Sequence, residues 1–138
     1  MACVNLLNNQ LNNLDNNTIA DLLRQIERIQ QEATRNSLGG CETCMIAQVF
    51  NTKPIAIYTC NGRFVVPTDA AETATANLFR VEDVRGDDTV LLRLITDTEG
   101  TLTCTAQTVV MRIDCICSVQ CFDPINCPTC RQLANLGV

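Results

Sequence analysis

A regular helical spacing of apolar residues marks one segment of the chain, residues 18–38. Thr18 occupies an N-cap position, and Asp21 follows three residues later, where a capping-box carboxylate would lie. Apolar side chains then recur at helical steps, at Ile19, Leu22, Leu23, Ile26, Ile29 and Ala33. Gly39-Gly40 ends the pattern. The spacing predicts an amphipathic helix over residues 18–38, docked either on its own domain or on a neighbouring subunit.

Beyond Gly40 the apolar residues alternate with polar ones, a period of two that is typical of strands. The alternating segments are residues 45–50, 54–60, 63–66, 78–84, 89–96 and 102–106. Turn signals separate them, at Asn61-Gly62, Arg85-Gly86-Asp87-Asp88 and Asp97-Thr98-Glu99-Gly100. Short strands without intervening helices predict a mainly β fold. We expect an antiparallel β-sandwich or barrel-like domain preceded by one N-terminal amphipathic helix, in the α+β class.

The longest alternating run covers residues Thr108–Cys121. Its odd-numbered positions are apolar or cysteine, and the last of them include Cys115, Cys117 and Cys121. A continuous strand would place these three thiols on one face, the face toward the core. Thiols two residues apart on a strand are separated by roughly 6.6 Å, so these would need partners elsewhere. The alternative is that they serve as small buried hydrophobes.

The composition is that of a single folded domain with extensions. The chain has 138 residues, of which 46% are hydrophobic and 18% charged. The pattern divides it into an Asn-rich N-terminal arm (1–17), the helix (18–38), a cysteine-rich β domain (41–122) and a loop-like C-terminal tail with a Cys-Pro step (123–138).

Charge and residue content exclude several classes of function. A net charge of −5 argues against a nucleic-acid partner, because phosphate contacts need clustered Lys and Arg. Histidine is absent, which removes imidazole bases, His-assisted nucleophiles and His metal ligands. The first residues lack the pattern of a secretory signal, and no apolar run is long enough to cross a bilayer. We therefore expect synthesis in a cytosol and no membrane span.

Ten cysteines conflict with that compartment, because cytosolic reductants oppose stable disulfides. They would bind metal, lie buried as inert thiols, or meet an oxidant after leaving the cytosol. With Lys53 as the single lysine, sulfur is a better route to covalent joining than an isopeptide bond. The candidates for inter-subunit or structural disulfides are Cys3, Cys41, Cys44, Cys60, Cys104, Cys115, Cys117, Cys121, Cys127 and Cys130.

Zinc binding is one alternative chemistry. The pairs Cys41-x-x-Cys44 and Cys127-x-x-Cys130 could supply four thiolates to a tetrahedral Zn²⁺, and the chain would then be a zinc-stabilised binding module. Their separation in the sequence is far beyond the spacing of a zinc ribbon.

Thiol oxidoreductase chemistry is a weaker alternative. A catalytic Cys-x-x-Cys normally begins a helix, whereas Cys41-Glu-Thr-Cys44 precedes a predicted strand. The adjacent acids Glu82/Asp83 and Asp87/Asp88 are expected to be solvated turn residues. We find no catalytic constellation and no cofactor motif, and we expect a protein that is not an enzyme.

Several short blocks of this sequence together resemble one protein family. The chain is similar to the CotY/CotZ/ExsY family of cysteine-rich spore coat and exosporium proteins of endospore-forming bacteria. The resemblance covers roughly residues 41–122 and rests on Asn51-Thr52-Lys53-Pro54, Tyr58-Thr59 with Gly62, Leu78-Phe79-Arg80-Val81-Glu82, Val90-Leu91-Leu92-Arg93-Leu94 and Ile113-Asp114-Cys115-Ile116-Cys117-Ser118-Val119-Gln120-Cys121-Phe122.

This resemblance implies a structural role. Members of the family assemble with themselves, often through hexameric rings, into two-dimensional lattices that disulfides reinforce. They are made in the mother-cell cytoplasm and deposited on the spore surface, beside other coat or exosporium proteins. Later lysis of the mother cell would expose the cysteines to oxidants, which would remove the conflict over compartment.

Overall fold

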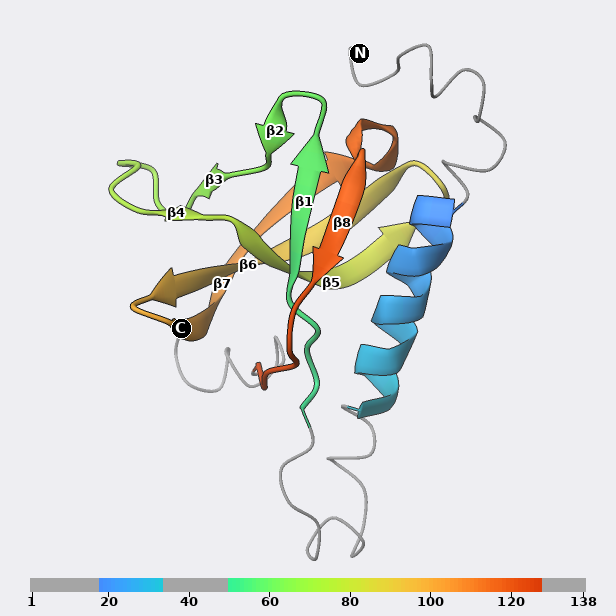
Figure 1. Ribbon diagram of the computed structural model, residues 1–138, viewed down its shortest axis with the longest axis horizontal. Helices are drawn as coiled ribbons and strands as arrows, with labels where there is room; N and C mark the ends of the chain where they lie inside the picture. The colour runs from blue at the N-terminus through green and yellow to red at the C-terminus, as the bar shows by residue number, and fades with distance from the viewer. Residues whose placement is uncertain (1–17, 34–49, 128–138) are drawn as a thin grey trace, which may run out of the picture.

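The fold is a curled antiparallel sheet, a half-barrel, preceded in the sequence by one helix (Figure 1). A computed structural model describes residues 18–33 and 50–127. The expectation of a mainly β domain preceded by one helix is confirmed. The predicted arm, the end of the predicted helix, the strand predicted over residues 45–50 apart from Phe50, and residues 128–138 of the predicted tail lie outside the described residues.

The strands form one large sheet and one small one. Their bounds are β1 Ile55–Thr59, β2 Gly62–Arg63, β3 Val66–Pro67, β4 Thr75–Ala76, β5 Leu78–Arg85, β6 Thr89–Thr98, β7 Thr101–Arg112 and β8 Ser118–Cys121. The large sheet has the order β2-β1-β5-β6-β7, and β8 pairs with β1. β3 and β4 form a separate two-stranded sheet.

Two of the predicted turns are confirmed. β5 and β6 are joined around Gly86, which has a φ of +60°, and their register continues to Arg85↔Thr89. β6 and β7 are joined by Glu99 and Gly100, with φ values of +53° and +87°. Two successive positive values are those of the tight turn that suits the twist of a hairpin.

The turn predicted at Asn61-Gly62 lies one residue earlier. Thr59 is paired with Gly62, so the loop residues are Cys60 and Asn61. Gly62, at φ +112°, is the first residue of β2. The residue with a positive φ, Gly62, therefore lies just after the turn and not within it.

The continuous strand predicted over Thr108–Cys121 is wrong. β7 ends at Arg112, a 3₁₀ turn covers Ile113–Cys115, and β8 begins at Ser118 and pairs with β1, whereas β7 pairs with β6. Cys115 is half-buried, and Cys117 and Cys121 are exposed, so the three cysteines do not share a core face. The alternation continues through the turn in the sequence, but the chain itself changes direction there.

Residues 18–33 form the helix, which packs on one face of the sheet. Its buried stripe is Ala20, Leu23, Ile26 and Gln30. The predicted stripe included Ile29, which is instead 63% exposed. Gln30 can take the inward position because both ends of its amide are hydrogen-bonded: Nε2 donates to the Val81 carbonyl at 2.7 Å, and Oε1 accepts from Lys53 N at 3.0 Å.

The helix also covers part of one strand edge. β1 pairs with β5 only at Ile55↔Phe79, so the rest of that edge of β5 has no partner in β1. Three helical residues at steps of three reach toward β5 and the turn that follows it: Arg24 donates to Gly86 O at 2.6 Å, Glu27 accepts from Val84 N at 3.4 Å, and Gln30 donates to Val81 O. Burial raises the pKa of the Glu27 carboxyl group. The helix therefore runs beside β5 in the opposite direction and covers an otherwise open edge.

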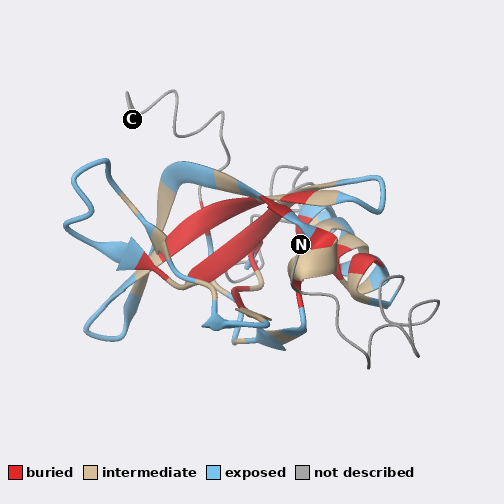
Figure 2. Ribbon diagram, turned by 90° about the horizontal axis from the view of Figure 1, so that it is seen from above, coloured by how far each residue is buried: buried red, intermediate tan, exposed pale blue. Residues whose placement is uncertain are grey.

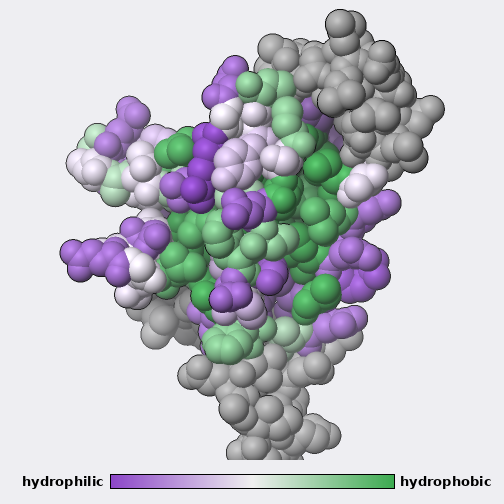
Figure 3. Space-filling view, in the orientation of Figure 1, coloured by the Kyte–Doolittle hydropathy of each residue, from purple (hydrophilic) through white to green (hydrophobic). Residues whose placement is uncertain are grey.

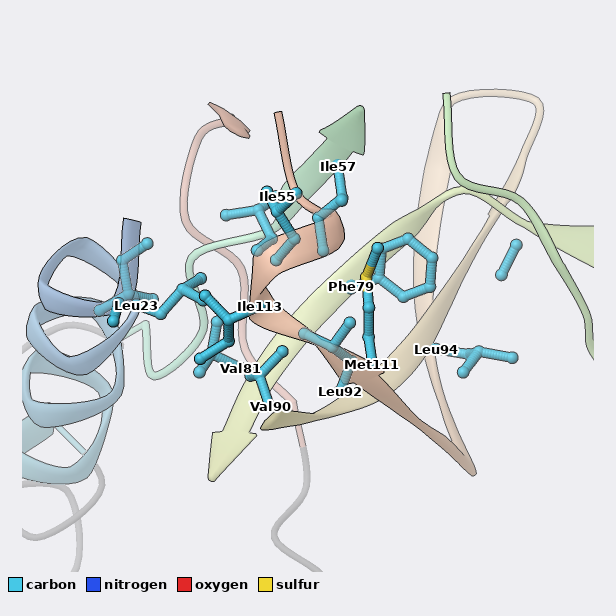
Figure 4. Close-up of a cluster of buried hydrophobic side chains, with 14 residues drawn as sticks. Leu23, Ile55, Ile57, Phe79, Val81, Val90, Leu92, Leu94, Met111 and Ile113 are labelled. Carbon is cyan, nitrogen blue, oxygen red and sulfur yellow. The ribbon is translucent and has the colours of Figure 1, made fainter. Parts of the chain in front are cut away.

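The main hydrophobic cluster lies between the helix and the inner face of the curled sheet (Figure 4). It contains Leu23 from the helix, Ile55 and Ile57 from β1, and Phe79 from β5. The Phe64 and Phe79 ring centroids are 5.4 Å apart. Buried residues concentrate in the middle of the central strands, and the loops are exposed (Figure 2).

A second, smaller cluster lies on the opposite face of the sheet. Its buried members are Ala56, Leu78 and Ile95, and Phe122 and Ile125 pack against them. Phe122 and Ile125 belong to the segment that follows β8. Residues 123–127, the described part of the predicted tail, thus pack on the β domain.

Candidate functional site

Six of the ten cysteines lie in the described residues, and their environments separate them into different chemical classes. They are Cys60, Cys104, Cys115, Cys117, Cys121 and Cys127. The predicted candidates Cys3, Cys41, Cys44 and Cys130 lie outside the described residues.

Cys104 and Cys127 form a disulfide. Their Cα atoms are 5.6 Å apart, and the bridge joins positions 23 residues apart in the sequence. Cys104 is in β7 and Cys127 follows β8, so the disulfide joins the segment after β8 to strand β7. The Cys127 residue is 3% exposed, which shields this sulfur from reagents in solution.

A frame of hydrogen bonds, made by the Asn51 side chain and by the backbone of Thr52 and Ile125, holds Cys127 in place. Asn51 Nδ2 donates to Cys127 O at 2.7 Å, and Cys127 N donates to Asn51 Oδ1 at 2.8 Å. Thr52 and Ile125 exchange two backbone bonds, of 3.0 and 2.9 Å. Because this frame fixes Cys127 by hydrogen bonds as well, the disulfide joins segments that are already aligned. The sequence did not predict the hydrogen bonds between Asn51 and Cys127, since no local pattern links these two residues.

An ionic cluster lies next to this frame. Arg80 and Arg93 are paired directly across β5 and β6, and Glu82 contacts both: Oε2 is 2.9 Å from Arg80 Nη1, and Oε1 is 2.7 Å from Arg93 Nε. Arg80 Nε also donates to Thr52 Oγ1 at 2.8 Å. The Glu82 side chain is only 15% exposed, so the expectation of a solvated turn residue is wrong for Glu82. A bulge between Val81 and Asp83 sets Glu82 out of the regular register, where its carboxylate meets both guanidinium groups.

Cys60 and Cys117 form a pair of thiols at the surface. Their sulfur atoms are 3.5 Å apart, and both residues are exposed. Cys60 lies in the β1–β2 turn, and Cys117 directly precedes β8. Cys117 N donates to Tyr58 O at 2.8 Å, which extends the β1–β8 pairing and holds the two residues together.

Cys115 and Cys121 differ from that pair. Cys115 ends the 3₁₀ turn and packs against the main cluster. Cys121 is the last residue of β8, opposite Ile55, and is exposed. The strand β8 therefore has an exposed thiol just before its first residue and another at its last. Apolar residues gather on the same side of the molecule, around β1, β8 and the adjacent helix (Figure 3).

The structure bears on the zinc alternative through Cys127 alone. A cysteine in a disulfide has no thiolate for a metal ion. A site made of Cys41, Cys44, Cys127 and Cys130 would therefore need the Cys104–Cys127 bond to be reduced. Among residues 18–33 and 50–127, no group of three or more Cys, Asp or Glu side chains is arranged to hold a metal ion.

The described helix is not long and apolar enough to cross a membrane. Comparison of the chain with protein-family models, with curated proteins and with solved structures gave no match.

Proposed function

We propose that this chain is a structural protein of the bacterial spore surface, in the coat or the exosporium. It assembles with copies of itself into an ordered two-dimensional lattice, which disulfides between subunits then reinforce. The support for the family comes from the resemblance of residues 41–122 to the CotY/CotZ/ExsY proteins. The observation that carries the mechanism is that Cys60, Cys117 and Cys121 are exposed on a domain whose Cys104 and Cys127 are already bonded internally.

The residues that carry the resemblance have a structural task in this fold. Asn51 and Thr52 hold Cys127 and Arg80, and Glu82 joins Arg80 to Arg93. The Ile113–Phe122 block supplies the 3₁₀ turn, β8 and its thiols. Residues with such tasks suit a building block, since each of them fixes the shape of the domain.

Assembly proceeds in two stages. Non-covalent docking forms cyclic oligomers, hexameric rings by the resemblance, and then a sheet in which many weak contacts sum through multivalency. Among the described residues β7 pairs only with β6, and β8 only with β1, so each presents a strand edge on which another chain can add. Cysteines that the lattice brings together then oxidise.

The history of the spore supplies the oxidant. The chain is made in the reducing cytoplasm of the mother cell and is deposited around the spore with other coat or exosporium proteins. Disulfides between subunits form after lysis of the mother cell, when cytosolic reductants no longer oppose them.

Electron microscopy of the purified full-length chain tests this function. We expect ordered arrays, and we expect non-reducing electrophoresis to show covalent oligomers that reductant dissolves. Cys121→Ser should reduce the covalent oligomers, because it removes an exposed thiol, whereas Cys104→Ser removes an internal bridge and should leave them. Monomers alone, with and without reductant, would exclude the proposal.

A further inference from the structure

The close approach of Cys60 and Cys117 carries an inference about a single chain. We propose that these two residues form a second intramolecular disulfide, a redox-responsive clamp between the β1–β2 turn and the start of β8. The bond lies within one subunit, so the inference does not depend on the lattice. It also removes two of the three exposed thiols of the described residues from the set that can join subunits.

Distance and alignment favour this bond. The sulfur atoms are 3.5 Å apart, and they need to approach by roughly 1.5 Å to reach the disulfide length of about 2.05 Å. The backbone bond from Cys117 N to Tyr58 O already fixes the two chain segments side by side. Cys60 is in a turn, so a small backbone adjustment there breaks no strand ladder.

Exposure makes the pair accessible to a small oxidant. A low-molecular-weight disulfide such as oxidised glutathione supplies the oxidising equivalents. One cysteine thiolate, its proton released to water, attacks a glutathione sulfur and expels one glutathione thiolate. The thiolate of the second cysteine then attacks the protein sulfur of the mixed disulfide and expels the other. Two cysteines are oxidised, and one glutathione disulfide is reduced to two thiols.

The two bridges differ in how easily reductants reach them. Cys127 is almost completely buried and Cys104 is half-buried, whereas Cys60 and Cys117 are both exposed. Thiol–disulfide exchange requires access to sulfur, so the Cys60–Cys117 bond should open first as reductant is added. The chain thus combines a less accessible disulfide with one that opens and closes with the redox state of the solution.

Peptide mapping after oxidation with glutathione disulfide tests the proposal. Chymotryptic cleavage after Tyr58 and Phe64 places Cys60 on a peptide with no other cysteine. Cleavage after Phe79 and Phe122 leaves Cys104, Cys115, Cys117 and Cys121 together on another peptide, so fragmentation of the linked product must assign the bond to Cys117. We expect the Cys60–Cys117 link in the parent and in Cys121→Ser, and its loss in Cys60→Ser and in Cys117→Ser.

A mixture of ¹⁴N- and ¹⁵N-labelled chains separates bonds within a chain from bonds between chains. An intramolecular clamp gives linked peptides that are wholly light or wholly heavy. Hybrid masses, a link from Cys60 to another cysteine, or glutathione retained on Cys60 in the parent would each overturn the proposal. The lattice experiment can fail without affecting this result, and the reverse also holds.

Discussion

At the residue scale, backbone conformation identifies a position where the native side chain is unfavourable. Glu99 has a φ of +53° and is followed by Gly100 at +87°. The left-handed conformation costs a residue with a Cβ roughly 1 kcal/mol, and less for Asn. Asp97 Oδ1 accepts from Gly100 N at 2.9 Å and closes the turn.

Replacing Glu99 by Asn should therefore stabilise the protein. Asn-Gly is the preferred pair in a turn with two positive φ values. We expect the free energy of unfolding to rise by about 0.5 kcal/mol in urea denaturation. Glu99→Val is the matched control, since a β-branched side chain is least suited to this conformation, and it should lower stability. Equal stability of the two variants would show that the turn does not impose this conformation.

At the element scale, buried polar groups fix how the helix and the strands pack. Gln30 joins the helix to Val81 in β5 and to Lys53 before β1. Periodicity predicted the helix, because the apolar stripe is local. It placed Ile29 inward in place of Gln30, because the partners of Gln30 are distant in the sequence. The limit applies to Glu82 in part: alternation along β5 places it on the same face as Arg80, but nothing local reveals Arg93 in β6 as its second partner.

Replacing Gln30 by Leu should weaken helix docking. The substitution keeps most of the side-chain volume but removes the partners of a buried carbonyl and a partly buried N–H. We expect a loss of about 2 kcal/mol in urea denaturation. Gln31→Leu is the matched control on the exposed face and should change stability by less than about 0.5 kcal/mol. Similar losses in both variants would contradict the docking role of Gln30.

Replacing Glu82 by Gln should destabilise the β5–β6 pair. The change removes a carboxylate that contacts both guanidinium groups, and Arg93 is 2% exposed. Removing one partner of a buried ion pair costs about 3 kcal/mol. The neighbouring Asp83 pairs with Arg85 at the surface, so Asp83→Asn should cost less than about 0.5 kcal/mol. Chemical denaturation of both variants checks the difference, and equal effects would mean that the buried pair does not fix the strands.

At the scale of the whole molecule, two chain segments far apart in sequence cover the outer face of the sheet. Residues 50–53 and 122–127 meet there through Asn51, Thr52, Ile125 and Cys127. Sequence alternation predicted the class of fold and the β5–β6 and β6–β7 hairpins, because strand and turn signals are local. It did not predict the Cys104–Cys127 bond, because ten cysteines allow very many pairings.

Loss of that bond should destabilise the entire domain. Cys104→Ser removes a bridge between positions 23 residues apart, for which the expected loss in free energy of unfolding is about 3 kcal/mol. With reductant present in both samples, the parent and Cys104→Ser should unfold at nearly the same urea concentration, while Cys121→Ser without reductant should resemble the parent. A parent whose midpoint does not respond to reductant would show that the bond contributes nothing.

The pairing of β1 with β8 has a consequence for synthesis on the ribosome. β1 is the first strand of the large sheet to be translated, and β8 is the last. Four register pairs join them, so one edge of β1 has no hydrogen-bonding partner in a nascent chain that does not yet include residue 118. The large sheet is therefore complete only once residue 121 has been synthesised, and a polypeptide terminated before β8 leaves unpaired the side of β1 that β8 covers in the folded protein.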